Sequence, residues 1–270
     1  MDIPSILRIF HEPMASPHQS QRRIVGVSTK MYFSASRTGQ YVDQLLQLLS
    51  DSDATPLDHV DVFIVPDHVT LVSVINKVQG KKIWCGAQDT FHDDTGAYTG
   101  EVSPAVLAEV GCRLVEVGHA ERRRLFGETD EITAKKAAAT ARNGMVPLVC
   151  IGEKMRGETS ISAVDECRGQ VESVLAAVPD DAEVILAYEP VWAIGASQPA
   201  EVDYVVEVTS AIRQLECIQK RSGTTRILYG GSAGPGLFQK LKDGVDGLFL
   251  GRFAHDPAQF YKTIQEVATA

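Results

Sequence analysis

Short apolar runs alternate with amphipathic segments along most of this chain. Eight runs are apolar on both faces, which is typical of buried parallel strands; they are residues 24–29, 60–65, 82–87, 114–118, 145–151, 184–189, 226–229 and 247–250. Helical spacing is found at 34–49, 67–78, from 103 onward, and at 130–141, 161–178, 200–217, 235–241 and 256–268. Ser103 before Pro104 is a favourable helix start, and Asp130 is predicted to cap the helix that begins there.

This alternation predicts the fold class. Eight strand–helix units in 270 residues fit a single α/β domain folded as a closed (β/α)8 barrel. A doubly wound open sheet is the alternative, but such sheets usually carry a glycine-rich segment after the first strand, where this chain has Ser28-Thr29-Lys30. Residues 1–23 show no period and contain three prolines, so we expect a partly disordered N-terminal extension before a barrel domain at 24–270.

Charge, cysteine spacing and the length of the apolar runs limit the partners and the location that we expect for this protein. The formal net charge is −9, which argues against nucleic acid. The five cysteines are dispersed and none has the spacing of a zinc site, so a reducing, cytoplasmic location and no metal are expected. No apolar run is long enough to span a membrane, and the N-terminal segment lacks the basic start of a signal peptide.

The candidate chemistry follows the predicted strands, because a barrel of this kind places its active site at the carboxyl ends of its strands. Lys30 follows the first strand and His119 the fourth, with Glu121 two residues further on. A proline directly after Glu189 stops the sixth strand, so this carboxylate lies at a strand tip. The apolar segment behind it, with Trp192, is predicted to be a loop that closes over a general base.

Glycines gather after the last three strands, at Gly195, at 230–231 before Ser232, and at Gly251 before Arg252. Glycine lets backbone N–H groups approach a ligand closely, and this part of the barrel mouth commonly binds phosphate. Neutral backbone donors would hold an anion despite the acidic net charge of the chain.

Each candidate residue also has a structural interpretation, as a solvated lysine, a core histidine or an ordinary turn. For Arg122 and Arg123 we expect that at least one forms an ion pair, with Glu128 or Glu153 as its partner. A lysine, a histidine and a glutamate on separate strand tips nevertheless favour a catalytic site.

A series of motifs runs in unbroken order from about residue 24 to residue 268: Val117-Gly118-His119-Ala120-Glu121-Arg122-Arg123, Phe126-Gly127-Glu128, Cys150-Ile151-Gly152-Glu153, Tyr188-Glu189-Pro190-Val191-Trp192-Ala193-Ile194-Gly195, Tyr229-Gly230-Gly231-Ser232 and Asp246-Gly247. Together they resemble the triosephosphate isomerase family, and the segment 96–104 is similar to that family's dimer loop. The resemblance implies a TIM barrel, an intramolecular aldose–ketose isomerase, a small phosphorylated sugar as substrate, and no metal or organic cofactor.

The resemblance also implies catalytic roles. Glu189 would move a proton between two neighbouring carbons while His119, kept neutral, polarises the carbonyl; triosephosphate isomerase is itself a well-known example of this pairing. Lys30 would supply positive charge to the substrate, and Glu121 would lie near Lys30.

Other positions would bind phosphate or shape the assembly. Tyr229 and Ser232 would latch the loop that carries Trp192 when it closes. Thr99 would cross the interface of a homodimer and support the active site of the partner subunit. Backbone N–H groups would hold the phosphate at four positions, which are Gly195, Ser232, Gly251 and Arg252.

The sequence departs from the family pattern at several points. Ser28 stands where the family has an asparagine that touches the substrate, which leaves more room or one contact fewer. Ala120 replaces a serine, Arg252 replaces a glycine, and residues 196–198 replace the usual hinge of the loop. Ser28 together with Gly251-Arg252 also resembles tetrulose-phosphate isomerases, a branch of the same fold that acts on a substrate one carbon longer.

Three functions are therefore open. The leading prediction is interconversion of D-glyceraldehyde 3-phosphate and dihydroxyacetone phosphate through an enediolate, a reaction of glycolysis and gluconeogenesis, because this is the commoner activity of the fold family. The alternative is the same chemistry on a four-carbon ketose phosphate. The third is a non-catalytic paralogue that binds a sugar phosphate or a protein, against which the joint presence of Lys30, His119 and Glu189 argues.

Overall fold

The computed structural model describes residues 22–50, 56–157, 159–195 and 199–270. Eight parallel strands pair in chain order within these ranges, and β8 pairs back to β1, so the sheet closes into a barrel. The strands are β1 (Arg23–Ser28), β2 (Val60–Val65), β3 (Ile83–Ala87), β4 (Leu114–Val117), β5 (Val146–Ile151), β6 (Val184–Tyr188), β7 (Thr225–Tyr229) and β8 (Gly247–Leu250). Closure confirms the predicted (β/α)8 barrel and excludes the open sheet.

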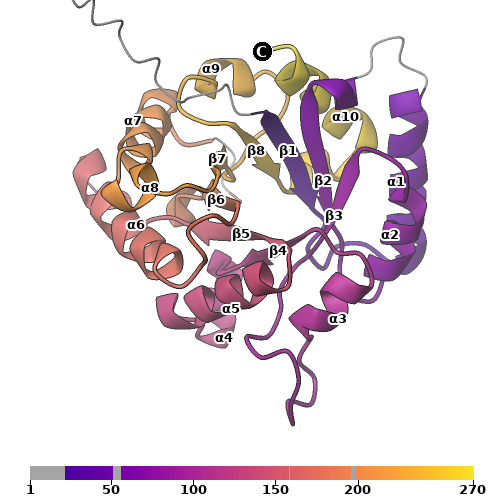
Figure 1. Cartoon of the computed structure of the whole chain (residues 1–270). Coiled ribbons are helices and arrows are strands. Elements are labelled where there is room, and N and C mark those ends of the chain that lie inside the picture. Colours follow the sequence, from indigo (N-terminus) through magenta and orange to yellow (C-terminus); the bar gives the residue numbers. More distant parts are fainter. Residues whose placement is uncertain (1–21, 51–55, 158, 196–198) are drawn as a thin grey trace, which may run out of the picture.

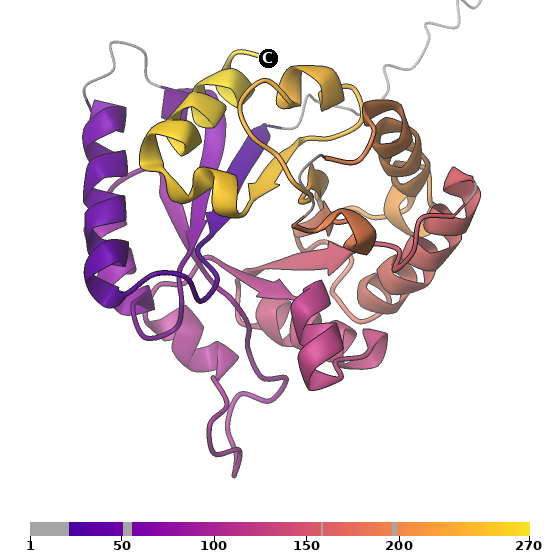
Figure 2. The ribbon, with the colours of Figure 1, turned by 180° about the vertical axis from the view of Figure 1, so that it is seen from behind.

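Helices form a ring around the outside of the barrel (Figures 1 and 2). In the described residues they are α1 (Ala35–Ser50), α2 (Leu71–Val78), α3 (Pro104–Glu109), α4 (Ala120–Phe126), α5 (Asp130–Arg142), α6 (Ser160–Leu175), α7 (Val202–Arg213), α8 (Glu216–Gln219), α9 (Phe238–Leu241) and α10 (Pro257–Ala268). Three short 3-10 helices, η1 (Pro56–Asp58), η2 (Val191–Ala193) and η3 (Arg252–His255), lie between them. None of the helices described here is long and apolar enough to cross a membrane.

Buried side chains form two layers, because successive residues of a strand point to opposite faces. One cluster consists of strand residues only, such as Phe63 and Leu114, and fills the barrel interior. The other joins strand residues such as Val115 and Val117 to the surrounding helices. On β4 this alternation directs Glu116 into the barrel.

The element boundaries follow the sequence pattern closely, with three differences. Thr129 caps α5 instead of Asp130: its hydroxyl accepts the N–H of Ile132 at 3.2 Å, and Asp130 is the first helical residue. The sequence pattern does not predict α4, because none of its residues is buried and it has no apolar period. The predicted helix at 200–217 is divided into α7 and α8.

Two sequence predictions fall mainly outside the described residues. Most of the predicted N-terminal extension lies there, whereas Arg23 opens β1 and Arg22 pairs with Asp61, with Nε 2.6 Å from Oδ1. The altered hinge at 196–198 also lies outside the described ranges.

Candidate active site

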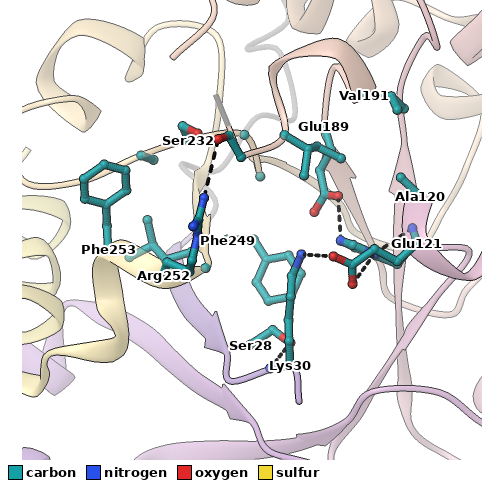
Figure 3. Close-up of a pocket in the computed structure, with 18 of the residues that line it drawn as sticks. Ser28, Lys30, Ala120, Glu121, Glu189, Val191, Ser232, Phe249, Arg252 and Phe253 are labelled. Atoms are coloured by element: carbon teal, nitrogen blue, oxygen red, sulfur yellow. Dashed lines mark hydrogen bonds and ion pairs between the residues drawn. The ribbon is translucent and has the colours of Figure 1, made fainter. Parts of the chain in front are cut away.

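A cavity of about 950 Å³ opens at the carboxyl ends of the strands (Figure 3). Most of the predicted site residues line it, namely Ser28, Lys30, His119, Glu121, Glu189, Gly195, Ser232, Gly251 and Arg252. Trp192, Tyr229 and Thr99 do not line it. In the described part of the chain, no group of three or more His, Cys, Asp or Glu side chains could hold a metal ion.

Glu189 follows β6 directly and is buried. Its Oε1 accepts a hydrogen bond from Sγ of Cys150 at 3.7 Å. Its Oε2 lies 3.3 Å from Nε2 of His119, although the two are not aligned for a hydrogen bond. A Cβ atom at Gly230 would lie 2.5 Å from Cγ and Oε1 of Glu189, so the glycine leaves room for this side chain.

The protonation state of Glu189 is set mainly by burial. Burial raises the pKa of Glu189 to about 8, an effect that Lys30 opposes and Glu116 reinforces. A carboxyl group with a pKa near neutrality can remove a proton and hold it until it is returned, which is what a general base must do.

His119 is the N-cap residue of α4. Its Nδ1 accepts the backbone N–H of Glu121 at 3.1 Å, which assigns the proton of the neutral ring to Nε2. Burial lowers the pKa of His119 to about 4, and Lys30 adds to this effect. The imidazole is therefore neutral, and Nε2 is its donor.

Lys30 is the only non-glycine residue in the described ranges with a positive φ, at 47°. The side-chain amide of Gln88 holds this backbone by donating to the carbonyls of Lys30, at 3.0 Å, and Val65, at 3.3 Å. Nζ of Lys30 pairs with Oε1 of Glu121 at 2.9 Å. Burial alone would lower the pKa of Lys30, but Glu189 and Glu121 outweigh it and raise the pKa, so the lysine stays charged in the cavity.

A second group of buried charges, which we name the Lys136 cluster, consists of Asp89, Arg122, Glu128 and Lys136. Nζ of Lys136 lies 2.8 Å from Asp89 and 2.6 Å from Glu128. Nε of Arg122 lies 2.8 and 2.6 Å from the same two carboxylates. Because Arg122 belongs to α4 and Lys136 to α5, the cluster fixes the helix that His119 caps.

The ion pair of Arg122 with Glu128 confirms one of the pairings expected from the sequence. Nη1 of Arg123 pairs instead with Asp130, at 2.5 Å. Glu153, the other acidic residue considered, contacts neither arginine in a salt bridge and has a different task.

Glu153 anchors the segment that follows Glu189. Its carboxylate accepts hydrogen bonds from Nε1 of Trp192 at 2.7 Å, from the hydroxyl of Tyr204 at 3.0 Å and from the hydroxyl of Tyr188 at 3.1 Å. The first turn of the segment, η2, is thereby tied to the barrel through the indole of Trp192.

Tyr229 and Ser232, the predicted latch residues, contact both ends of this segment. The hydroxyl of Tyr229 accepts the N–H of Ala200 at 3.1 Å. Oγ of Ser232 lies 3.4 Å from the carbonyl of Ala193, to which it donates. Both residues therefore already bond to backbone on either side of residues 196–198.

The predicted phosphate-binding residues lie away from the base. In Figure 3, Glu189 and Glu121 lie on one side of the cavity, and Ser232 and Arg252 on the other. Nη2 of Arg252 donates to the carbonyl of Gly195 at 3.4 Å, so this exposed side chain brings positive charge to that side. The separation leaves room for a sugar between a phosphate and the base.

The sequence pattern does not single out two residues of the site, Glu116 and Cys150. Glu116 is buried on β4 and lines the cavity, and the hydroxyl of Ser28 opposes the rise of its pKa that burial causes. The sequence did hold one sign of Glu116: it is the single acidic residue in a strand that is otherwise apolar. Both faces of this strand are buried, and a carboxyl group is unusual in such a place.

Thr99 lies outside the cavity, in the loop between β3 and α3. This loop extends away from the barrel, and Thr99 is exposed in it (Figure 1). Tyr98 next to it packs against Phe91, with tilted rings whose centroids lie 4.3 Å apart, and donates a hydrogen bond to Asp93 at 2.6 Å. The loop is thus held by its own contacts and by Arg142, which donates to the carbonyl of His92 at 2.7 Å and pairs with Asp94 at 3.0 Å.

Comparison with known proteins extends this picture. Residues 23–267 match the family model described as triosephosphate isomerase. The chain belongs to the triosephosphate isomerase family. An L-erythrulose-1-phosphate isomerase of Pectobacterium atrosepticum is 45% identical over 253 residues, which cover 93% of this chain and 97% of the relative.

Other members of the family are also similar along nearly their whole length. An L-erythrulose-1-phosphate isomerase of Rhizobium etli is 37% identical and covers 91% of this chain and 92% of its own. A triosephosphate isomerase of Aquifex aeolicus is 35% identical, and the match covers 90% of this chain and 98% of the relative. The predicted enzyme class, an isomerase of the triosephosphate isomerase type, is confirmed, and so is the resemblance to the tetrulose-phosphate branch.

Proposed function

We propose that this chain isomerises a four-carbon ketose phosphate, with L-erythrulose 1-phosphate as its substrate. The relatives at 45% and 37% identity carry that substrate in their names. Ser28 carries the proposal: it places a short side chain on the cavity wall where the family has an asparagine. The proposal replaces the leading sequence prediction, a triose phosphate, which becomes the second candidate.

The chemistry of this substrate fits a site built for proton transfer between adjacent carbons. In L-erythrulose 1-phosphate the ketone is at C2, C3 carries a hydroxyl group and the proton to be removed, and C4 is a hydroxymethyl group. Moving the carbonyl from C2 to C3 gives a second ketose phosphate, whereas the same exchange in a triose phosphate gives an aldehyde. Both reactions need one base that reaches two carbons.

Glu189 is that base in the proposed mechanism. Its carboxylate takes the proton from C3, the C–H electron pair forms the C2–C3 double bond, and the C2 oxygen takes the Nε2 proton of His119. The C3 hydroxyl then returns a proton to His119 as Glu189 delivers its proton to C2. Lys30, held by Glu121, stabilises the negative charge that develops on the oxygens.

The phosphate is held at the other side of the cavity. Backbone N–H groups of Gly195, Ser232 and Gly251 and the side chain of Arg252 are the proposed donors. Closure of the segment 190–195 would exclude water from the enediolate, which protects it from losing its phosphate.

The test compares kcat/KM on L-erythrulose 1-phosphate and on D-glyceraldehyde 3-phosphate. We expect the four-carbon substrate to be preferred. Ser28→Asn, which restores the family's residue, should lower kcat/KM on it by about 10-fold or more and spare the triose, since the added bulk meets only the longer substrate. A clear preference of the unmodified protein for the triose would establish the second candidate, which the 35% identity to a triosephosphate isomerase favours.

We further propose a homodimer formed through the loop around Thr99. The support is the exposed position of Thr99, the hydrogen bonds that hold the loop, and its likeness to the family's dimer loop. Light scattering should give twice the chain mass of 29.3 kDa, and Thr99→Arg should shift the protein toward monomers. A monomer at micromolar concentration in the unmodified protein would refute the dimer.

A further inference from the structure

The proposed mechanism leaves one buried acidic group of the cavity without a task. Glu116 is 4% exposed, and its side chain points into the barrel because it alternates with Val115 and Val117, which face the helices. It lines the same cavity as Glu189. A carboxyl group buried this deeply is rare unless something binds it.

The bonds of Glu116 are incomplete. The hydroxyl of Ser28 acts on this carboxyl group and lowers its pKa, which burial raises. Oε2 is buried and has no hydrogen-bond partner among the described residues. An unpaired buried oxygen of this kind is costly to the folded protein, and a hydroxyl group of a ligand would satisfy it.

The strand order fixes where Glu116 lies relative to the bound substrate. The eight strands close in chain order, so β4 stands across the barrel from β8. The proposed phosphate donors follow β6, β7 and β8, at Gly195, Ser232 and Gly251. A substrate anchored there extends across the mouth, and its end farthest from the phosphate reaches the β4 side, where Glu116 is.

We propose that Glu116, which lines the cavity together with Ser28, recognises the terminal hydroxymethyl group of the four-carbon substrate. This inference rests on the proposed function and deepens it, because C4 is the group that a triose phosphate lacks. A triose leaves the carboxyl oxygen unpaired, and a site built around a polar contact discriminates strongly against the analogue that lacks it. Glu116 is therefore a specificity residue rather than a second base.

The decisive variant is Glu116→Met, which keeps the length of the side chain and removes its polar atoms. We expect the ratio of kcat/KM on L-erythrulose 1-phosphate to kcat/KM on D-glyceraldehyde 3-phosphate to fall by about 10- to 100-fold, as for loss of a hydrogen bond to a charged group. Any effect through Glu189 acts on both substrates and cancels in the ratio. Glu116→Gln, whose amide still binds a hydroxyl, should keep most of the preference.

Leu114→Met is the matched control. Leu114 lies on the same strand and the same face, two residues below, but does not line the cavity. It should leave the substrate ratio unchanged, which separates recognition by Glu116 from altered packing of β4. Thermal unfolding of each variant checks that it is folded.

Two results separate the inference from the proposed function. If the unmodified protein prefers the four-carbon substrate and Glu116→Met keeps that preference, the role of Glu116 is wrong and the function stands. If the unmodified protein turns over only the triose, the proposed function is wrong. In that case L-erythrulose 1-phosphate is measured as an inhibitor of the triose reaction: a tenfold or greater rise of its inhibition constant in Glu116→Met supports recognition, and an unchanged constant overturns it.

Discussion

The active site and the Lys136 cluster are both groups of buried charges, but they are balanced differently. In the Lys136 cluster two carboxylates face two cations, and each carboxylate contacts both cations. The active site instead places three carboxyl groups, Glu116, Glu121 and Glu189, around one lysine, Lys30. The first arrangement can be fully ionised, whereas in the second Lys30 is the cation that acts on both buried carboxyl groups, Glu116 and Glu189.

The difference is visible in the pKa values. Burial alone would raise the pKa of Glu128, but Lys136 and Arg122 outweigh it and lower the pKa; at Asp89 burial prevails and raises the pKa. In the active site, burial raises the pKa of Glu116 to about 7 and that of Glu189 to about 8. A balanced cluster holds a helix in place, and an unbalanced one keeps a proton available near neutral pH.

The strongest test of the unbalanced group is Glu189→Gln. Turnover should fall by about 10²- to 10⁴-fold on either substrate, because the amide cannot take the proton. The free energy of unfolding should not fall, because a desolvated carboxyl group is removed. Steady-state kinetics and urea denaturation measure the two effects, and unchanged turnover would rule out Glu189 as the base.

The balanced group should respond in the opposite way. Lys136→Met leaves Asp89 and Glu128 short of one cation in a buried site, which should lower the free energy of unfolding by about 3–5 kcal/mol. Lys135→Met is the matched control: Lys135 is the adjacent residue and forms an exposed i,i+4 pair with Glu131, so its loss should have no measurable effect. Equal stability of the two variants in urea would contradict the structural role of the cluster.

A smaller effect is expected from crowding the base. Gly230→Ala places a Cβ 2.5 Å from Glu189, so the carboxylate must move and turnover should fall by about 10²-fold. Gly169→Ala on α6 is the control, since nothing lies within 4 Å of the added atom, and it should keep full activity. A fully active Gly230→Ala protein would mean that Glu189 does not need the observed position.

The smallest effect is a displacement of the pH profile. Glu189 must be ionised to act and its pKa is raised to about 8, so kcat/KM should decline as the pH falls below about 8. Lys30 and the thiol of Cys150 oppose this rise in pKa, whereas Glu116 and Glu121 add to it. Glu116→Gln removes one of the two negative neighbours and should move the acidic limb to lower pH.

The acidic limb of the pH profile reports an apparent pKa that belongs to the interacting groups together and not to one residue. The comparison is therefore made between profiles of the same substrate, for the unmodified protein and for Glu116→Gln. A limb that stays in place would show that Glu116 does not act on the base.

Much of the fold could be predicted from the sequence, because buried parallel strands are short apolar runs bounded by polar turns. The placement of Lys30, His119 and Glu189 followed from their positions directly after such runs. By contrast α4 could not be predicted, since a helix that buries none of its residues leaves no apolar period.

The site was harder to predict where its chemistry depends on contacts between distant strands. In the sequence, Glu116 is a single acidic residue in an apolar strand. Closure of the barrel places it on the wall of the same cavity as Ser28. Gln88 supports Lys30 in a backbone conformation with a positive φ, and a lysine in the sequence gives no indication of that conformation. The capping of α5 by Thr129 was missed because Asp130 is an equally good cap by residue type.

The hydrogen bond between Trp192 and Glu153 gives this protein a built-in optical probe. The chain has two tryptophans, and the other, Trp84, lies on β3 beside the guanidinium groups of Arg113 and Arg226. Trp84→Phe keeps an aromatic ring there and leaves Trp192 as the sole indole emitter. Because Nε1 of Trp192 donates to the carboxylate of Glu153, the fluorescence of Trp192 would report, in real time, each rearrangement of the segment 190–195 that separates the indole from that carboxylate.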